Sequence, residues 1–360
     1  MFDVIIVGGG VAGSYLASKL EGLNVLLIEK NKKVLLKDSG IVSKGFLDFF
    51  DEDLIKCEIN KMEAFSPSGH TFALNNHKPF AYIIKRVEFS RHLRSIAKKT
   101  STTIYENVLG VTYSKDCVTV HTTGGTYQSK LVVGADGANS MVRKYARIQR
   151  PFLSLGIMVK TKNKMDGNIS VFFNKYYSPD FFSWIIPQNN EYGTISAIRP
   201  REYLKNFEKE QYMPGGAIIA YLIPTGYVRS YSDRTLLVGD SCGQNKPLTG
   251  GGIMFGLKAA GYATDTINKA FSMGRFDSKV LRNYETAWKK DFAWEIDKQF
   301  LIRMLYRRLS NNDIDNIFLQ MGPHMERLSN FDYDKFSGSW IKLPKIKMLK
   351  VILSASTGFF

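Results

Sequence analysis

Four short apolar runs mark the N-terminal and central parts of the chain, and glycine or an acidic residue follows each of them. They are Val4–Val7, Val25–Ile28, Leu131–Val133 and Thr235–Val238. Unbroken apolar runs of this length are typical of strands buried on both faces of a parallel sheet. Segment Ala12–Leu20, between the first two runs, has the length of one crossover helix. The pattern therefore predicts a βαβ unit in this part of the chain.

Segments 63–84 and 151–225 have a different pattern, in which aromatic-rich strands alternate between apolar and polar positions and are separated by turns. Alternation with a period of two predicts strands with one buried face, and we expect the two segments to form one antiparallel sheet. Residues 118–130, with glycines at their centre, predict a hairpin. Residues 250–271 predict a long apolar helix, and from about residue 281 the pattern is helical and basic.

Length and composition are those of a folded protein. The chain has 360 residues, of which 44% are hydrophobic, and its formal net charge is +16. No run approaches the ~18 apolar residues that span a bilayer, and the first residues lack the basic start of a signal peptide. The three cysteines fit no zinc pattern. We therefore expect a cytoplasmic protein without a metal site, one that can associate with the inner face of the cell membrane.

A glycine-rich turn follows the first predicted strand. Gly8-Gly9-Gly10-Val11-Ala12-Gly13 fits the pattern G-x-G-x-x-G. Its glycines allow a tight turn, close approach of the backbone to a pyrophosphate and close helix–strand packing, and the helix N-terminus attracts phosphate. Glu29 ends the second strand, where a carboxylate accepts hydrogen bonds from ribose hydroxyls. The predicted nucleotide site therefore contains the following residues: Gly8, Gly10, Ala12, Gly13, Glu29 and Lys30.

Motifs later in the chain indicate that the bound dinucleotide is FAD and not NAD. Gly134-Ala135-Asp136-Gly137 resembles the DG motif of flavoprotein hydroxylases, and Val238-Gly239-Asp240-Ser241 resembles their GD motif, whose aspartate binds the ribityl chain. Downstream, three glycines open a helix and direct N–H donors toward an anionic group, which in these proteins is the flavin. The resemblance implies FAD as the cofactor and adds these contacts: Asp136, Gly137, Asp240, Gly250, Gly251, Gly252 and Ile253.

These patterns predict an α/β fold in which a FAD-binding Rossmann-like domain carries an inserted antiparallel-sheet substrate domain and a C-terminal helical region. The FAD-binding domain takes residues 1–62, 85–150 and 226–280. The substrate domain takes residues 63–84 and 151–225. The C-terminal helical, basic region takes residues 281–360.

Most of the chain, up to about residue 320, resembles the geranylgeranyl reductase family, which includes the archaeal digeranylgeranylglycerophospholipid reductases. The segments that carry this resemblance are Ser43–Gly45, Arg86–Leu93, Val108–Val111, Phe182–Pro187 and Leu309–Asp315. It implies a FAD-dependent reductase that saturates carbon–carbon double bonds of isoprenoid chains of membrane lipids or their precursors. It also implies FAD contacts at Ser39, Gly40, Arg86 and Val108, and the Arg86 guanidinium can neutralise a pyrophosphate.

The chain departs from this family just before Ser43. Many members have a cysteine there in C-G-x-G, whereas this chain has Lys37-Asp38-Ser39-Gly40. A mechanism in which that cysteine donates a proton is therefore in doubt. Asp38 can serve as a proton donor if burial raises its pKa, and the alternative is an exposed loop carboxylate.

Saturation of an isolated alkene needs a hydride at one carbon and a proton at the other, and the alkene has no carbonyl to polarise. Positioning and exclusion of water must then supply most of the catalysis, which predicts an apolar tunnel. The expected pocket residues are Phe173, Phe182, Trp184, Pro187 and Tyr221, with Trp184 also a catalytic candidate. Any one of these aromatic residues can equally be ordinary core.

The expected partners are an isoprenoid lipid, an anionic membrane surface and an electron donor, but no nucleic acid. No second dinucleotide motif is present, so the donor can be NAD(P)H, a ferredoxin or a reduced quinone. Residues 298–308 carry four cations and no acid, and Lys342, Lys345, Lys347 and Lys350 lie in an apolar segment. Such basic amphipathic stretches can lie on an anionic membrane.

Two other functions stay open. Residues 182–187 also resemble the W-x-W-x-I-P motif of flavin-dependent halogenases, with phenylalanine in place of the first tryptophan, so a flavin monooxygenase or halogenase is the first alternative. A prenyl-binding carrier without flavin is the second, although the Asp136-Gly137 and Gly239-Asp240 motifs argue against it.

Overall fold

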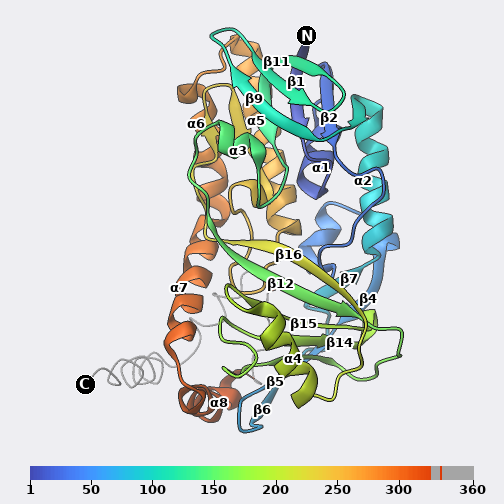
Figure 1. Ribbon diagram of the computed structural model, residues 1–360, viewed down its shortest axis with the longest axis vertical. Coiled ribbons are helices and arrows are strands. Elements are labelled where there is room, and N and C mark those ends of the chain that lie inside the picture. Colours follow the sequence, from blue (N-terminus) through green and yellow to red (C-terminus); the bar gives the residue numbers. More distant parts are fainter. Residues whose placement is uncertain (326–332, 335–360) are drawn as a thin grey trace, which may run out of the picture. The chain divides into compact units, whose positions relative to one another are not determined.

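The computed structural model describes residues 1–325 and 333–334, which form parts of two compact units. Unit 1 comprises Met1–Leu36, Lys85–Leu153 and Pro224–Asp297. Unit 2 comprises Lys37–Ile84, Ser154–Ile223 and the described residues from Lys298 onward. Each unit is built around a sheet of its own (Figure 1).

The sheet of unit 1 has a parallel centre with strand order β17-β18-β11-β1-β2-β8. Its strands are β1 (Phe2–Val7), β2 (Val25–Glu29), β8 (Ser101–Tyr105), β11 (Thr126–Gly134), β17 (Tyr231–Ser232) and β18 (Thr235–Leu237). Two more strands, β9 (Val108–Tyr113) and β10 (Val118–Thr122), extend β11 as an antiparallel meander. The parallel order places the carboxyl ends of β1, β2, β11 and β18 at one edge of the sheet, where nucleotides bind in such folds.

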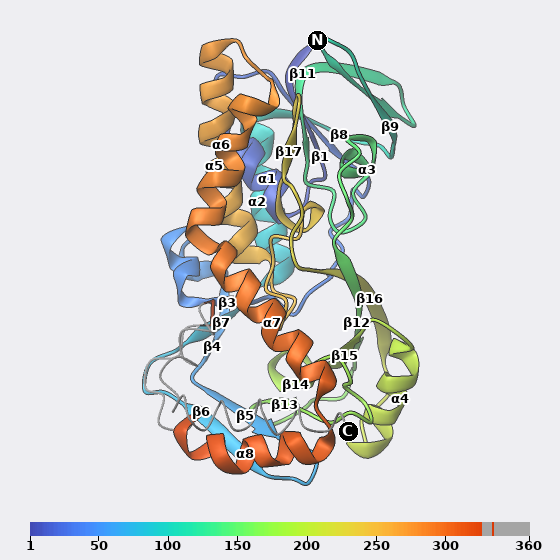
Figure 2. The same cartoon turned by 90° about the vertical axis from the view of Figure 1, so that its left-hand side faces the viewer.

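Helices cover one face of this sheet, and the meander with α3 covers the other (Figure 2). The helices of unit 1 are α1 (Val11–Lys19), α2 (Arg86–Thr100), α3 (Met141–Tyr145), α5 (Ile253–Met273) and α6 (Ser278–Trp288), with a single turn η4 (Gly239–Ser241) and a π-helical turn η5 (Lys289–Ala293). Asp277 caps α6 by accepting from the backbone N–H groups of Lys279 and Val280. Gly274 ends α5 in the left-handed conformation.

Unit 2 contains a seven-stranded sheet with order β16-β12-β15-β14-β13-β5-β6 and a small sheet with order β3-β7-β4. The strands of the large sheet are β5 (Lys61–Phe65), β6 (Thr71–Asn75), β12 (Phe152–Lys160), β13 (Ile169–Phe172), β14 (Ser183–Ile186), β15 (Glu191–Ser196) and β16 (Ala217–Thr225). Those of the small sheet are β3 (Ile41–Ser43), β4 (Ile55–Ile59) and β7 (Ala81–Ile84).

Unit 2 contains η1 (Lys44–Asp48), η2 (Glu52–Leu54), η3 (Pro187–Asn189), α4 (Pro200–Glu210) and α8 (Asn311–Met325). Helix α7 (Trp294–Arg308) begins in unit 1 and belongs to unit 2 from Lys298 onward. Leu204 and Phe207 of α4 bury their side chains against Ile157 of β12 and Phe172 of β13. Burial of these apolar groups drives the packing of α4 on the sheet.

The α/β class is confirmed, and several details differ from the prediction. Residues 81–84 form β7 of the small sheet instead of joining the large one, and residues 37–62 cluster with unit 2. The large sheet is not wholly antiparallel, because β13 runs parallel to β5. Residues 281–297 belong to unit 1, so no single C-terminal region begins at 281. The expected basic segment at 342–350 lies outside the described residues.

None of the helices in the described part of the chain combines the length and the hydropathy needed to cross a bilayer.

Candidate functional site

The glycine turn between β1 and α1 contains glycines whose added Cβ would clash and one, Gly10, that faces open space. A Cβ on Gly8 (φ +105°) would lie 2.3 Å from the carbonyl oxygen of Ala135, and a Cβ on Gly13 would lie 1.9 Å from the carbonyl oxygen of Gly8. A Cβ on Gly10, the N-cap of α1, would meet nothing within 4 Å. Gly10 therefore leaves room for a ligand beside the N-terminus of α1, as a bound pyrophosphate needs.

Glu29 lies at the end of β2 beside this turn. Its Oε2 accepts from the backbone N–H of Gly9 at 2.8 Å, and its Oε1 accepts from that of Asn31 at 2.8 Å. Each carboxylate oxygen has a second lone pair, so the group can also accept from ribose hydroxyls. Lys30 follows directly and is exposed.

Arg94 of α2 holds the chain around Glu29, and the sequence analysis did not identify it. Its Nη1 donates to the carbonyl oxygens of Asn31 (3.0 Å) and Lys32 (2.9 Å), and its Nη2 lies 3.9 Å from Glu29 Oε1. These contacts fix the segment after β2. The sequence distance of 65 residues between Glu29 and Arg94 gives no sign of them.

The Asp136-Gly137 turn follows β11 and has an unsatisfied polar atom. Asp136 Oδ2 accepts from the backbone N–H groups of Met141 (2.7 Å) and Val142 (3.3 Å), whereas its buried Oδ1 has no partner. Burial raises the pKa of Asp136, and the backbone donors oppose that rise. An unsatisfied buried carboxylate oxygen is costly, and a bound polar ligand would remove that cost.

Buried Arg143 ties this turn to the Gly239-Asp240 turn. Its Nη2 donates to the carbonyl oxygen of Ala138 at 2.9 Å, and its Nη1 donates to that of Ser241 at 2.5 Å. Because β11 and β18 are neighbours, the two turns lie at adjacent carboxyl ends of the sheet. The structure thus brings together two motifs that are about 100 residues apart in the sequence.

The fingerprint, the Gly239-Asp240 turn and the start of α5 converge. A Cβ on Gly239 (φ +73°) would lie 3.3 Å from Cβ of Ala12, and one on Gly256 would lie 3.4 Å from the same atom. Asp240 Oδ1 would lie 3.0 Å from a Cβ on Gly252, the N-cap of α5. Gly250 has φ +71° and Gly251 and Gly252 follow it, so Ile253 begins the helix behind a glycine turn.

Asn245, a further residue that the sequence analysis missed, lies fully buried in this region, and neither atom of its amide group has a partner in the described residues. A Cβ on Gly252 would lie 3.3 Å from Asn245 Cβ. Together with Asp136 Oδ1 and the open space at Gly10, these unpaired atoms fit a ligand that has both phosphate and polar ring groups. They therefore fit FAD.

Arg86 and Val108 lie in unit 1 at the start of α2 and of β9. The Arg86 guanidinium donates to the hydroxyl of Ser90 and lies 5.9 Å from the ring centroid of Phe89. These contacts hold the side chain near its own helix. The proposed contact of Arg86 with the pyrophosphate remains a prediction.

Asp38, Ser39 and Gly40 form a tight loop in unit 2. Asp38 Oδ1 accepts from the backbone N–H of Gly40 at 3.0 Å, and the Ser39 carbonyl accepts from Asn189 Nδ2 at 2.8 Å. Gly40 has φ +69°, which suits glycine at this turn, and its carbonyl accepts from the N–H of Ile84. The loop is therefore held to β7 and to the η3 turn that Pro187 opens.

Trp184 lies on β14 and is 5% exposed. Its register partner on β15 is Gly193, where a Cβ would lie 2.5 Å from Cζ2 of the indole. The indole Nε1 is buried and has no partner, and the ring meets that of Phe182 edge-on at 6.3 Å between centroids. An unpaired buried N–H is an unusual feature that needs an explanation.

Phe173 is the centre of an aromatic cluster in unit 2. Its ring centroid lies 5.5 Å from that of Phe181, 6.0 Å from those of Phe182 and Tyr306, and 5.7 Å from that of Phe318. The sequence analysis did not identify Tyr306 of α7 and Phe318 of α8. Both residues lie on helices more than 100 positions after Phe173, and nothing in the sequence pattern indicates that these helices pack beside it.

Tyr221 lies on β16, at the opposite edge of the large sheet from β5 and β6. A Cβ on Gly156 of β12 would lie 2.7 Å from Cζ of Tyr221, so the ring lies over that glycine. Burial raises the pKa of the Tyr221 hydroxyl, and the negative charges of Asp38 and Glu191 add to the rise. Tyr221 is therefore near acidic groups of unit 2 and not among the aromatic rings around Phe173.

No group of three or more His, Cys, Asp or Glu side chains in the described residues could hold a metal ion. Cys242 is fully buried, its Sγ donates to the Leu237 carbonyl at 3.2 Å, and burial raises the pKa of its thiol.

The parallel sheet, the glycine turn before α1 and the motifs at the neighbouring strand ends define a protein of the FAD-binding class. The family model described as "FAD binding domain" matches residues 1–212, and the chain belongs to this family. FAD is its cofactor. The confirmed α/β fold is thus that of a flavoprotein.

Curated relatives cover almost the whole chain. Digeranylgeranylglycerophospholipid reductase 1 of Methanococcoides burtonii is 26% identical over 89% of this chain and 87% of its own. The digeranylgeranylglycerophospholipid reductase of Methanocaldococcus jannaschii is 26% identical over 93% of this chain and 94% of its own. The resemblance to the geranylgeranyl reductases is confirmed by these relatives.

Solved structures share the fold. A geranylgeranyl bacteriochlorophyll reductase-like protein of Thermoplasma acidophilum matches with a TM-score of 0.85 and 19% identity, over 99% of this chain and 98% of its own. The p-nitrophenol 4-monooxygenase of Pseudomonas putida matches with a TM-score of 0.72 and 15% identity, over 98% of both chains. At these identities the likeness shows the fold alone.

Proposed function

We propose that this protein is a FAD-dependent reductase that saturates carbon–carbon double bonds in geranylgeranyl chains of membrane lipids or their precursors. The observation that carries the proposal is the match of about nine-tenths of the chain to digeranylgeranylglycerophospholipid reductases, together with a complete set of FAD-type turns in unit 1. The unpaired Asp136 and Asn245 atoms support the cofactor assignment.

Bound in its reduced form, FAD supplies the hydride that alkene reduction needs. The residues of unit 1 bind and orient the cofactor. We assign the pyrophosphate to the turn at Gly10 with Arg86, the adenosine ribose to Glu29 and the ribityl chain to Asp240. The N-terminus of α5, behind Gly250–Gly252, presents N–H groups and a partial positive charge to the isoalloxazine edge.

The prenyl chain is apolar, so we assign it to the aromatic side chains of unit 2. Phe173, Phe182 and Trp184 form a contiguous series of ring contacts. Such a lining excludes water and orients the alkene, and these are the effects that a substrate without polar groups allows. Pro187 ends the strand that carries Trp184, and Tyr221 contributes at the far edge of the sheet.

We assign the role of proton donor to the alkene to Asp38. Its carboxylate lies in the loop where the family cysteine is replaced, and its Oδ1 accepts from the Gly40 N–H. A carboxyl group held by a backbone donor is fixed in position, as a general acid must be. The nearby Tyr221 hydroxyl interacts electrostatically with Asp38.

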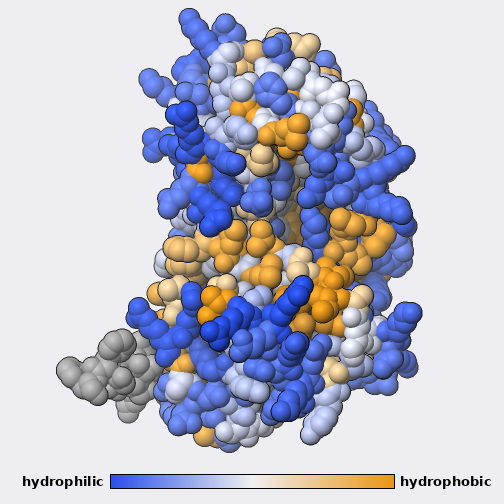
Figure 3. Space-filling view, viewed as in Figure 1, coloured by the Kyte–Doolittle hydropathy of each residue, from blue (hydrophilic) through white to orange (hydrophobic). Residues whose placement is uncertain are grey.

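Contact with an anionic membrane surface would bring the protein to its lipid. Figure 3 shows that apolar side chains reach the surface in patches among charged ones. On α7, Trp294 is 68% exposed and Leu301 is 59% exposed, and the two are about two turns apart on one face. Arg307 and Arg308 end the same helix. Exposed apolar groups beside cations favour adsorption to anionic lipid.

The proposal is tested with chemically reduced, FAD-loaded protein and candidate isoprenoid lipids under anaerobic conditions. Mass spectrometry should show a gain of two hydrogen atoms for each double bond saturated, while the flavin absorbance returns to the oxidised form. Product that forms only when oxygen is admitted would support a monooxygenase or halogenase instead. Purified protein that holds no yellow chromophore, even after incubation with FAD, would support a carrier.

A further inference from the structure

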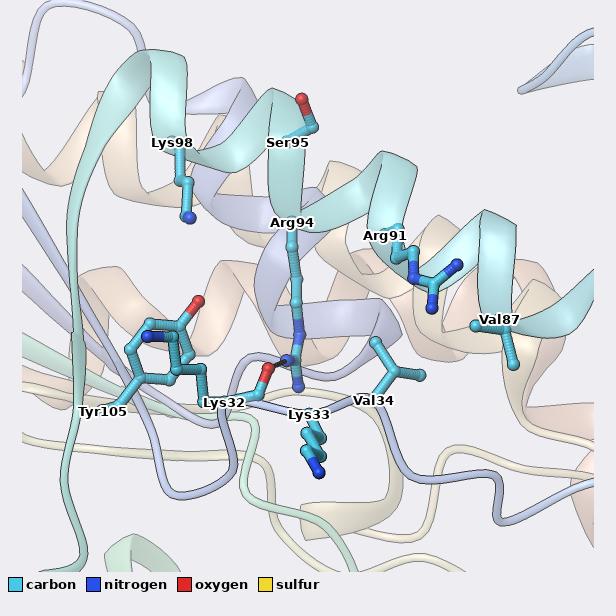
Figure 4. A pocket seen from close by; sticks show the side chains of 9 residues that line it. All are labelled: Lys32, Lys33, Val34, Val87, Arg91, Arg94, Ser95, Lys98 and Tyr105. Carbon is cyan, nitrogen blue, oxygen red and sulfur yellow. Dashed lines mark hydrogen bonds between the residues drawn. The ribbon is translucent and has the colours of Figure 1, made fainter.

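A basic pocket of about 600 Å³ lies in unit 1, outside the residues assigned to FAD. Its walls are the segment 32–34 after β2, one face of α2, and Tyr105 at the end of β8 (Figure 4). Five of the nine lining residues are cations: Lys32, Lys33, Arg91, Arg94 and Lys98. No acidic side chain lines it.

The fold holds these charges together. Val87, Arg91, Arg94 and Lys98 follow α2 at spacings of three and four residues, which places them on one face of the helix. Arg94 crosses to the opposite wall, where it donates to the Lys32 carbonyl oxygen (Figure 4). Its hydrogen bonds fix the distance between the two walls, so the pocket is formed before a ligand enters.

Three of the cations are available to a ligand. In the part of the chain that the structure describes, the side chains of Lys33, Arg91 and Lys98 form no hydrogen bond or ion pair, and all three are exposed. Like charges one turn apart on a helix repel one another. A bound anion would remove this repulsion, and Arg91 can bind phosphate oxygens through two parallel N–H groups.

The shape and lining favour a phosphorylated nucleotide over other anions. A concave volume of this size is typical of small-molecule sites. The Tyr105 ring offers an apolar face for a base, and the cations surround the space beside it. FAD itself does not account for the cations, because its pyrophosphate is assigned to the turn at Gly10 with Arg86, and its adenosine ribose, which carries no phosphomonoester, is assigned to Glu29.

We propose that this pocket binds the phosphate groups of a nucleotide other than FAD, with Arg91, Lys98 and Lys33 as the phosphate ligands and Tyr105 beside the base. A dinucleotide with a phosphomonoester on its adenosine ribose fits this lining better than one without it. The proposal does not depend on the reduction of prenyl chains, since it concerns binding to oxidised, FAD-loaded protein.

The test is titration calorimetry of FAD-loaded full-length protein with NADP⁺, NAD⁺ and inorganic phosphate. NADP⁺ should bind at least about tenfold more tightly than NAD⁺, and added salt should weaken the binding. The double variant Arg91→Gln/Lys98→Gln should lose this preference and keep its flavin absorbance. Lys99→Gln, which removes an exposed cation of α2 that does not line the pocket, should behave like the native protein.

Several outcomes would overturn the proposal. Equal affinities for NADP⁺ and NAD⁺, or a preference for NADP⁺ that persists in the double variant, would show that the pocket does not recognise the ribose phosphate. Loss of FAD from the double variant would assign these cations to the flavin nucleotide. Displacement of NADP⁺ by an equal concentration of inorganic phosphate would show that the pocket binds anions without selecting a nucleotide. Alkene reduction is not measured, so failure here leaves the reductase proposal untouched.

Discussion

The indole ring of Trp184 lies against Gly193 on the neighbouring strand, where any β-carbon would come within 2.5 Å of the ring. The glycine therefore creates the space that the indole fills. The buried Nε1 of the same ring has no partner. A tightly packed ring with an unpaired donor indicates that the ring position is fixed for a purpose other than a hydrogen bond.

Trp184→Phe should therefore keep the fold and the flavin and lose turnover. The phenyl ring removes a donor that makes no hydrogen bond, so we expect a cost of about 1–2 kcal/mol in the free energy of unfolding, from lost packing. Turnover of the prenyl substrate should fall by at least about tenfold if the indole contacts the alkene. Urea unfolding and anaerobic single-turnover reduction measure the two effects.

Trp288→Phe is the matched control. Trp288 is also fully buried, but its Nε1 donates to the Ser230 hydroxyl at 2.9 Å, and it lies in unit 1. This variant should lose stability through the lost hydrogen bond to Ser230 and keep turnover per folded molecule. Equal turnover in the native protein and Trp184→Phe would show that Trp184 is ordinary core.

Gly10→Ala separates cofactor binding from folding. The backbone of Gly10 has φ −77°, which alanine adopts freely, and its Cβ would meet no protein atom within 4 Å. The thermal midpoint of the flavin-free protein should therefore be unchanged. The methyl group would occupy the space next to the N-terminus of α1, so FAD affinity, measured by flavin fluorescence quenching, should fall by at least about tenfold.

Gly261→Ala controls for the change of residue type, because a Cβ on Gly261 in α5 also meets nothing within 4 Å. We expect unchanged FAD affinity and a small gain in stability from the higher helix propensity of alanine. Unaltered FAD affinity in Gly10→Ala would place the pyrophosphate elsewhere.

Asp240→Ala should lower FAD occupancy. A charged acceptor of hydrogen bonds contributes about 1.5–3 kcal/mol, which corresponds to a loss of affinity of about tenfold to a hundredfold. The flavin-to-protein absorbance ratio after gel filtration measures it. Asp265→Ala removes an exposed carboxylate of α5 and should retain full occupancy. If both variants retained FAD equally, the assignment of the ribityl chain to Asp240 would be wrong.

Lys175 should make the free energy of unfolding depend on pH in a direction that its environment determines. It lies in unit 2, where its Nζ donates to the Tyr306 carbonyl at 2.6 Å, and burial lowers its pKa to about 8 from an ordinary value of 10.5. Between these values the unfolded chain binds more protons than the folded one, so the free energy of unfolding should rise with pH from about 8 to about 10. Below about pH 8 both states are protonated and the group gives no slope.

Lys175→Met should flatten this rise in urea titrations carried out at a series of pH values, whatever its effect at pH 7. Lys205→Met, at an exposed position of α4, should keep the native slope. Above about pH 10 the buried tyrosines reverse the trend, because burial raises the pKa of groups such as Tyr177 and the unfolded chain then loses protons first. A slope that persists in Lys175→Met would show that another group titrates.

The elements that the sequence specifies locally were predicted well. The run Val4–Val7 and the glycines after it gave β1 and the turn, because a strand buried on both faces and a positive-φ glycine leave signs within a few residues. The hairpin of β10 and β11 also follows the prediction, since the glycines at 124 and 125 lie at its turn.

Features that depend on distant partners were not predicted. Residues 81–84 are all buried, so their sequence has no alternation that selects one sheet over another, and β7 pairs with a strand of only three residues, β3. The parallel pairing of β13 with β5 joins residues more than 100 positions apart. Arg94 and Asn245 lie beside the proposed FAD site only in the folded chain, because their surroundings come from elements far away in the sequence.

Lys160 and Glu191 test how much the large sheet of unit 2 depends on one ion pair. They are register partners on β12 and β15, Lys160 Nζ lies 2.5 Å from Glu191 Oε2, and the Glu191 side chain is 0% exposed. Lys160→Met would leave this carboxylate buried without its cation, which costs about 3–5 kcal/mol when both partners are buried. Because the Lys160 side chain is 27% exposed, we expect the lower end of this range.

The double variant Lys160→Met/Glu191→Gln should recover most of the loss, since an amide has a far smaller desolvation cost than a carboxylate. Urea unfolding of the native protein, Lys160→Met, Glu191→Gln and the double variant completes a double-mutant cycle. A double variant as unstable as Lys160→Met alone would show that lost packing of the lysine stem, and not the unpaired charge, sets the cost.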